Sequence, residues 1–262
     1  MSKPFVSQTL YFDTPPQTRR AIDLWVPDHL PLQPFTLFFV HGGGWVSGHR
    51  EGMHSLMYAF YRKGYACISV DYRLGGTPAT HQLADVREGL ALAHATLKNR
   101  GINQPFVLYG SSAGAHLALL AGLAPAGAAG DPYTGPTPPV AGLVSSCGPI
   151  TFEPWDDIFP GIWEAMEKAA GTPYTECPEL YRRLSPREYA NAGSPPILFL
   201  LGECEHMFPN AHTIAFAESL NAAGGRAEYH VYPLAEHGFF YNTTRRCQQM
   251  ALADVLAFLE SL

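Results

Sequence analysis

Two glycines flank a pair of serines where an apolar run meets a helix-forming run, in residues 110–114 (Gly-Ser-Ser-Ala-Gly). Residues 105–109 predict a buried strand, and residues 113–123 predict a helix. A strand that turns sharply into a helix strains the backbone of the middle residue, and only small neighbours fit such close packing. The pattern G-x-S-x-G therefore makes Ser112 the candidate nucleophile, with Ser111 as its neighbour inside the turn.

A second glycine motif lies upstream, where the apolar residues 35–40 predict a core strand that leads into residues 41–45 (His-Gly-Gly-Gly-Trp). Glycines after a core strand leave backbone N–H groups free to point into a cavity, which is how an oxyanion hole is built. The expected donors are the N–H groups of Gly43, Gly44 and Ala113. The alternative is a flexible turn without such a role.

These motifs resemble those of the α/β-hydrolases, within the group that contains the hormone-sensitive-lipase family and the kynurenine formamidases. Residues 41–45 resemble their HGGG and HGGxW signature, residues 71–74 (Asp-Tyr-Arg-Leu) resemble their D-Y-R-L segment, and residues 110–114 resemble their elbow. The resemblance runs from about Phe35 to the C-terminus and implies a serine hydrolase. The hormone-sensitive-lipase family usually carries a cap before this motif. Since only 40 residues precede His41, we expect that cap to be absent.

The apolar runs predict an α/β fold, the α/β-hydrolase fold, with a mostly parallel central sheet of about eight strands flanked by helices. We expect a single domain over residues 1–262. Residues 7–12 and 20–26 predict an antiparallel entry, with a turn around Pro15 and Pro16. The expected core strands are 35–40, 65–70, 105–109, 140–146, 196–201 and 227–232, and the expected helices are 52–63, 81–98, 113–123, 210–223 and 244–261.

Residues 148–195 interrupt this alternation and carry many aromatic side chains. The insertion leaves the sheet at the end where the loops of such folds carry the chemistry. We therefore expect a small lid over Ser112 whose apolar side chains line the substrate pocket, and the alternative is packing onto the body of the fold. The side chains expected at the pocket are Trp45, Phe152, Trp155, Phe159 and Trp163.

A serine hydroxyl needs a base to act as a nucleophile, and the base needs an orienting acid. In α/β-hydrolases the chain order is serine, acid, histidine. His237 follows the last predicted strand and precedes the last helix, in a segment that resembles the family's H-G-F. Relatives commonly show G-x-x-D with a proline four residues beyond the acid, and Glu205 and Pro209 occupy those two positions. Glu205 is therefore the expected acid, and Glu203 is its rival.

Other titratable residues near these motifs are expected to have structural roles. Cys204 and His206 flank the two carboxylates, but the local set lacks the ligand spacing of a zinc site. We expect neither a metal nor a cofactor. We expect His41 to brace the glycine loop by hydrogen bonds and His116 to pack beneath the site.

Composition limits the partners and the location. The net charge is −6 and the chain has no basic block, so binding to nucleic acid or an anionic membrane has no electrostatic support. Residues 1–5 lack the basic start of a signal peptide, and no apolar run approaches the roughly 20 residues of a membrane span. The five scattered cysteines suit reduced thiols, and Cys67 and Cys147 are expected to be plain core residues. We expect a cytoplasmic monomer or homodimer that acts on a small-molecule ester or amide.

Three functions remain open at this point. The first is a carboxylesterase that cleaves small to medium acyl or aryl esters through a Ser-His-Glu triad and an acyl-enzyme. The second is an arylformamidase, resembling the kynurenine formamidases, that hydrolyses N-formyl aryl amines. Trp45, where the lipase-related family often has Phe, and the missing cap favour it. The third is a ligand-binding receptor on the same fold, against which the presence of both Ser112 and His237 argues.

Overall fold

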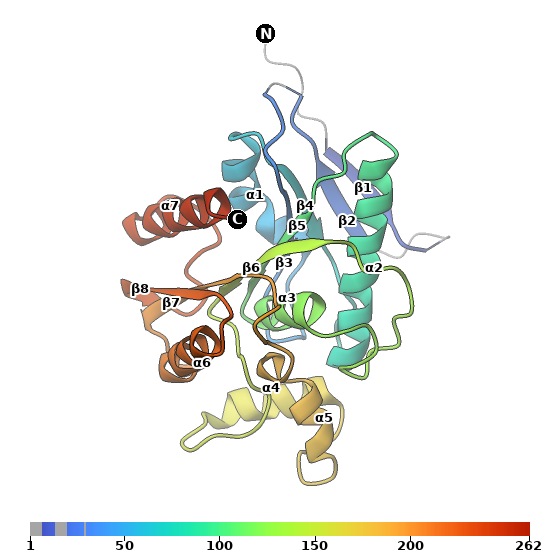
Figure 1. Cartoon of the computed structure of the whole chain (residues 1–262). Helices are drawn as coiled ribbons and strands as arrows, with labels where there is room; N and C mark the ends of the chain where they lie inside the picture. The colour runs from blue at the N-terminus through green and yellow to red at the C-terminus, as the bar shows by residue number, and fades with distance from the viewer. Residues whose placement is uncertain (1–6, 14–19, 29) are drawn as a thin grey trace.

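The computed structural model describes residues 7–13, 20–28 and 30–262, and its centre is one eight-stranded sheet (Figure 1). The strands are β1 (Ser7–Tyr11), β2 (Ala21–Trp25), β3 (Thr36–Val40), β4 (Ala66–Val70), β5 (Phe106–Ser111), β6 (Val140–Ser146), β7 (Ile197–Cys204) and β8 (Ala227–Glu236).

The sheet has the order β1-β2-β4-β3-β5-β6-β7-β8. All neighbours from β4 to β8 are parallel, whereas β1 and β2 form antiparallel pairs at one edge. The predicted mostly parallel sheet of about eight strands is thereby confirmed, as is the antiparallel entry. The turn expected at Pro15 and Pro16 lies outside the described residues.

Helices cover both faces of the sheet, and the insertion adds two more beyond it (Figure 1). None in the described part of the chain is long and apolar enough to cross a bilayer. The α-helices are α1 (His54–Tyr61), α2 (Ala79–Lys98), α3 (Ala113–Leu123), α4 (Pro160–Ala170), α5 (Pro178–Arg183), α6 (Asn210–Ala222) and α7 (Arg246–Glu260). Short 3₁₀ helices are η1 (Arg50–Met53) and η2 (Pro186–Glu188).

The alternation of side chains along the central strands builds two cores. Leu37 and Phe39 of β3 pack with α1 and α7 on one face, and Phe38 and Val40 pack with α2, α3 and α6 on the other. Because both faces are covered, the central strands are apolar throughout rather than alternating with polar residues. The insertion contributes to the second core through Met166 of α4, so part of it packs on the body of the fold.

Every parallel strand is followed, at the next position, by a side chain that can carry chemistry or hold a charge. The carboxyl ends of parallel strands meet at one edge of a sheet, so these side chains share that edge. They are His41 after β3, Asp71 after β4, Ser112 after β5, Cys147 after β6, Glu205 after β7 and His237 after β8.

Two glycines let α3 approach the end of β3. A Cβ on Gly114 would lie 2.3 Å from the carbonyl oxygens of Val40 and His41, and a Cβ on Gly110 would lie 2.3 Å from the Gly114 oxygen. Such distances are far below ordinary contact, so both positions require glycine. The sharp turn predicted from the sequence is held against β3 by this packing.

We expect Gly114→Ala to lower the free energy of unfolding by about 3 kcal/mol, the upper part of the usual range for overpacking, because the added methyl meets backbone atoms that cannot rotate away. Urea unfolding measures the change. Gly52→Ala is the matched control, since its Cβ would meet nothing closer than a His49 atom at 3.9 Å. Equal stability of the two variants would contradict the packing described here.

Candidate active site

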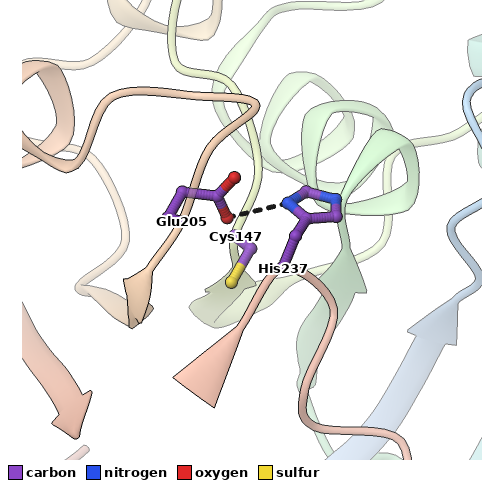
Figure 2. A group of neighbouring side chains, drawn as sticks. All are labelled: Cys147, Glu205 and His237. Carbon is purple, nitrogen blue, oxygen red and sulfur yellow. Dashed lines mark hydrogen bonds and ion pairs between the residues drawn. The ribbon is translucent and has the colours of Figure 1, made fainter. Parts of the chain in front are cut away.

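Side chains from three strand ends form one hydrogen-bonded chain. His237 Nε2 lies 2.8 Å from Ser112 Oγ, and its Nδ1 lies 2.7 Å from a carboxylate oxygen of Glu205. Figure 2 shows the Glu205–His237 pair, with Cys147 beside it. Both distances are those of ordinary hydrogen bonds. The structure therefore brings together the three residues that the sequence predicted for a triad.

Ser112 stands at the apex of the turn between β5 and α3, with a φ of 53° and a ψ of −123°. Its backbone N–H donates to the Ser146 carbonyl at 2.8 Å, which fixes the apex against the neighbouring strand β6. A positive φ is rare for a residue with a side chain and is found where the surroundings enforce it. Ser111, by contrast, is completely buried.

The Glu205 carboxylate is held by more than the histidine. Its second oxygen accepts the N–H groups of Met207 at 2.7 Å and Phe208 at 3.3 Å. Burial by itself raises the pKa of Glu205, but the hydrogen bond and charge of His237 and these two N–H groups outweigh it, so the pKa lies below its ordinary value. Glu203 is exposed, and its carboxylate accepts the Leu234 N–H at 2.9 Å.

The glycine loop beside Ser112 makes a tight turn in which Gly43 accepts the N–H groups of Val46 and Ser47 at 3.1 and 3.0 Å. Gly43 and Gly44 have φ values of 126° and 58°. A Cβ on Gly44 would meet no atom within 4 Å, so this part of the loop borders open space. Among the described residues, the N–H groups of Gly43, Gly44 and Ala113 have no assigned acceptor.

His41 lies behind the glycine loop. Its ring stacks on Tyr72 at a centroid distance of 4.3 Å and an angle of 13°, and the Tyr72 hydroxyl donates to the His41 carbonyl at 2.9 Å. His41 Nε2 lies 3.7 Å from Asp71. These contacts place His41 as a support of the loop, away from the reacting atoms.

Trp45, one of the predicted pocket residues, is almost completely buried, with only 2% of its surface exposed. Its indole N–H donates to His116 Nδ1 at 3.2 Å, and His116 Nε2 lies 2.7 Å from the Leu184 carbonyl. Burial lowers the pKa of His116 to about 4, so the ring is neutral at pH 7 and bridges two buried groups. Phe152 is also fully buried and stacks on His116 at 4.6 Å. Trp45 and Phe152 therefore pack in the core of the described structure, and their contact with a substrate stays a prediction.

Trp155 is connected to the triad through one intervening ring. It is half-buried, and its ring lies 6.3 Å from Phe208, whose ring lies 5.7 Å from His237. Trp155 and His212 also border a surface cavity of about 420 Å³. Among the predicted pocket side chains in the described residues, Trp155 is connected to His237 by these ring contacts.

The other two predicted pocket residues of the insertion are placed farther out. The Trp163 ring packs on Tyr174 and Tyr181, at centroid distances of 5.9 and 5.6 Å. Phe159 precedes α4 and is 61% exposed. Their contact with a substrate stays a prediction.

Two residues near the triad were missed by the sequence analysis. The Tyr241 hydroxyl accepts the Gly42 N–H at 3.1 Å and ties the loop that carries His237 to the glycine loop. Cys147, expected to be a plain core residue, has its thiol next to Glu205 and His237. An aromatic residue four positions after His237 was the only signal for the first, and the sequence held no signal for the second.

A buried network of charges supports the far side of the glycine loop. Arg50 Nε lies 3.0 Å from Asp23, and Arg50 also pairs with Asp71. His54 Nε2 lies 2.9 Å from Asp23, and the Thr9 hydroxyl donates to the Asp23 carboxylate at 2.7 Å. Burial by itself raises the pKa of Asp23, but the hydrogen bonds from His54, Thr9 and Arg50 outweigh it and lower the pKa to about 2.

The sequence matches one family model and several known esterases. A model of the BD-FAE family matches residues 22–220. The chain is 30% identical over 258 residues to Esterase LipC and 29% identical over 245 residues to Esterase LipQ, both from Mycobacterium tuberculosis (strain ATCC 25618 / H37Rv). Each match covers 88% of this chain, but only 59% and 57% of those relatives, so the chain spans less than two thirds of their length.

Solved structures show the same fold. The native esterase Est2 from the Planctomycetes species Thermogutta terrifontis matches with a TM-score of 0.78 at 21% identity, over 97% of this chain and 91% of that one. A bifunctional GH43-CE from Bacteroides eggerthii matches with a TM-score of 0.78 at 20% identity, over 95% of this chain and 37% of that one. These likenesses confirm the predicted α/β-hydrolase fold.

The low pKa of Asp23 makes the stability of the protein depend on pH. A fall from 3.8 in the unfolded chain to about 2 in the folded one stabilises the protein above about pH 4, and this gain is lost as the pH falls toward 2. We expect Asp23→Asn to lower the free energy of unfolding at pH 7 by about 2 kcal/mol, and the deficit to shrink below about pH 4. Urea unfolding of both proteins between pH 7 and pH 3 measures it.

The exposed residue Asp156 supplies the control, and Asp156→Asn should match the wild type at every pH. A deficit of Asp23→Asn that is equally large at pH 7 and pH 3 would mean that ionisation of Asp23 is not its cause.

Proposed function

The chain belongs to the BD-FAE family, and from this premise and the geometry of the site we propose that it is a serine carboxylesterase. The observation that carries the proposal is the hydrogen-bonded chain from Glu205 through His237 to Ser112. The sequence relatives named as esterases support it. The proposed substrates are small to medium acyl or aryl esters.

In the proposed mechanism, Ser112 Oγ attacks the ester carbonyl while His237 Nε2 accepts its proton. Glu205 accepts a hydrogen bond from His237 Nδ1–H, which keeps Nε2 unprotonated before the attack and stabilises the imidazolium that forms. The carbonyl oxygen becomes an oxyanion, and the N–H groups of Gly43, Gly44 and Ala113 are proposed to hold it. Their support is that no acceptor within the described residues uses them.

The imidazolium then returns the proton from Nε2 to the departing alkoxide, and the acyl group stays on Ser112. Water attacks this acyl-enzyme with His237 again as the base, and the acid product leaves. Each step exchanges a proton between His237 and a reacting oxygen, so the side chains present supply the whole cycle.

The arylformamidase alternative gains no support from this structure. Trp45 favoured it as a departure from the Phe that is frequent in the lipase-related family, and its indole is buried against His116. The relatives are named as esterases, and none of those reported above is named as a formamidase. The receptor alternative has no supporting observation, since Ser112, His237 and Glu205 are joined by hydrogen bonds.

We propose that residues 148–195 act as a lid through their first part. Trp155 packs on Phe208, which packs on His237, so Trp155 is the residue best placed to contact a bound ester. The later part, through Met166 of α4, is anchored in the core. Cytoplasmic location and a monomeric or dimeric state stay predictions from the sequence.

We expect the wild-type protein to hydrolyse aryl acetate and aryl butyrate faster than N-formylkynurenine. Ser112→Ala should lower kcat on all three by about 10⁴-fold or more, because the nucleophile is lost, while the thermal unfolding midpoint changes little. Steady-state kinetics on the three substrates, with circular dichroism for folding, measures both.

Ser111→Ala is the matched control and should keep activity, and a fluorophosphonate probe should label this variant and the wild type but not Ser112→Ala. Faster hydrolysis of N-formylkynurenine would favour the formamidase. An intact, unlabelled and inactive wild-type protein would favour the receptor.

We expect Glu205→Gln to lower kcat by about 10⁴-fold with little change in KM, since an amide favours the wrong histidine tautomer and the effect falls on the transition state. Glu203→Gln should lower kcat less than threefold, because Glu203 bonds the Leu234 backbone. Steady-state kinetics on aryl butyrate distinguishes them, and the reverse pattern would make Glu203 the acid.

A further inference from the structure

Cys147 lies against the triad but has no part in the proposed mechanism. One donor atom from each of Cys147, Glu205 and His237 lies within 4.8 Å of the other two (Figure 2). The three residues follow β6, β7 and β8, three adjacent strands of the sheet. A thiol, a carboxylate and an imidazole thus converge from separate segments of the chain.

The position of the thiol is fixed by the backbone. Cys147 has a φ of 51°, in the left-handed region that residues with side chains rarely adopt. Its N–H donates to the Leu200 carbonyl at 3.0 Å, and its thiol contacts the same oxygen at 3.6 Å. Strained backbone persists where the surroundings enforce it and is most common at functional sites.

The three donors form the ligand set of a thiophilic metal ion. Zinc is bound in proteins by cysteine sulfur, histidine nitrogen and carboxylate oxygen, whereas magnesium and calcium prefer oxygen alone. Zinc bonds of about 2.0–2.3 Å in a tetrahedron place the ligand atoms about 3.3–3.6 Å apart. The Glu205–His237 contact of 2.7 Å would therefore have to open by less than about 1 Å, and the separations of the thiol from these two atoms, at most 4.8 Å, would have to close by up to about 1.3 Å.

We propose that Cys147, Glu205 and His237 form an inhibitory site for a thiophilic divalent cation, Zn²⁺ or Cd²⁺. The ion binds Cys147 Sγ as the thiolate, His237 Nδ1 and a Glu205 oxygen. The thiol proton goes to solvent, and the imidazole proton moves from Nδ1 to Nε2, with no change of oxidation state. Protonated Nε2 cannot accept the proton of Ser112, so hydrolysis stops. The inhibition rests on the proposed esterase function, whereas the binding does not.

Of the two ligands paired by a hydrogen bond, His237 lies nearer to solvent than Glu205. The His237 side chain is 11% exposed and the Glu205 side chain 1%. His237 and Gly238 border an open surface groove of about 1090 Å³. Because Cys147 is buried, the ion reaches its thiol only when the surrounding segments open locally, so we expect inhibition to develop slowly rather than at mixing.

Cadmium is the probe, because its thiolate complexes absorb in the ultraviolet. The reference protein carries Cys177→Ser, Cys204→Ser and Cys247→Ser, which removes the three thiols that are not buried. We expect one Cd²⁺ per chain to produce the thiolate band in the reference protein and to lower aryl butyrate hydrolysis at least tenfold, with recovery on adding a chelator.

Adding Cys147→Ser or Cys147→Ala to the reference protein should abolish the band and the inhibition, measured as the rate with Cd²⁺ divided by the rate without it in the same variant. Cys67→Ser is the matched control, since Cys67 is also fully buried but belongs to the core between the sheet and α1, and it should keep both effects. Glu205→Gln should weaken the apparent affinity for Cd²⁺, measured from the thiolate band, at least tenfold. This variant tests the site if the Cys147 variants do not fold.

Absence of the band from the reference protein would overturn the proposal. So would a band that survives loss of Cys147, an affinity unchanged by Glu205→Gln, or inhibition without a band. A band that depends on Cys147 and Glu205, in a protein that hydrolyses no ester without metal, would support the metal site and reject the esterase function.

Discussion

The close contact between the first turn of α3 and the end of β3 fixes the geometry of the site. Gly114 lies against the carbonyl groups of Val40 and His41, at a distance that leaves no room for a side chain. The serine elbow and the glycine loop therefore cannot move independently. Ser112 keeps its place relative to Gly43 and Gly44, and the oxyanion hole proposed there would need no reorganisation during reaction.

The parallel sheet explains why distant segments meet at this edge. Each parallel strand ends one residue before a side chain with a polar or ionisable group, so the fold aligns these groups along one edge of the sheet. Behind that row, Tyr72 and Trp45 bond to His41 and His116, and Tyr241 bonds to Gly42. These aromatic side chains thus hold the glycine loop and α3 in place by hydrogen bonds.

The sequence allowed prediction of the features that depend on short-range constraints. The turn at Ser112 requires small neighbours, so glycine spacing located it, and the chain order serine, acid, histidine then located His237 and Glu205. Trp45 could not be placed in this way, because a tryptophan after a glycine loop fits a pocket or a core equally well. Trp45 is buried because its indole bonds to His116 on α3, a contact that appears only in the folded chain.

The thiol of Cys147 illustrates a second limit of the sequence. Its apolar surroundings predicted a core residue, and it is indeed buried. Its neighbours belong to loops after β7 and β8, more than fifty residues away, and its direction depends on a left-handed backbone conformation that no local pattern indicates. Contacts of this kind follow from the packing of strand ends, so they emerge only with the whole sheet.

Because β8 lies at the edge of the sheet, heating should affect the proposed activity before it unfolds the protein as a whole. Ser112 follows a central strand with neighbours on both sides, whereas His237 follows a strand paired only with β7. Near the end of β8, Leu234 is 84% exposed, although its neighbour Ala235 is buried. Edge segments open more readily than the core. Warming should therefore displace His237, the proposed base, before Ser112 and the central strands, so the proposed hydrolysis should be lost reversibly below the unfolding temperature.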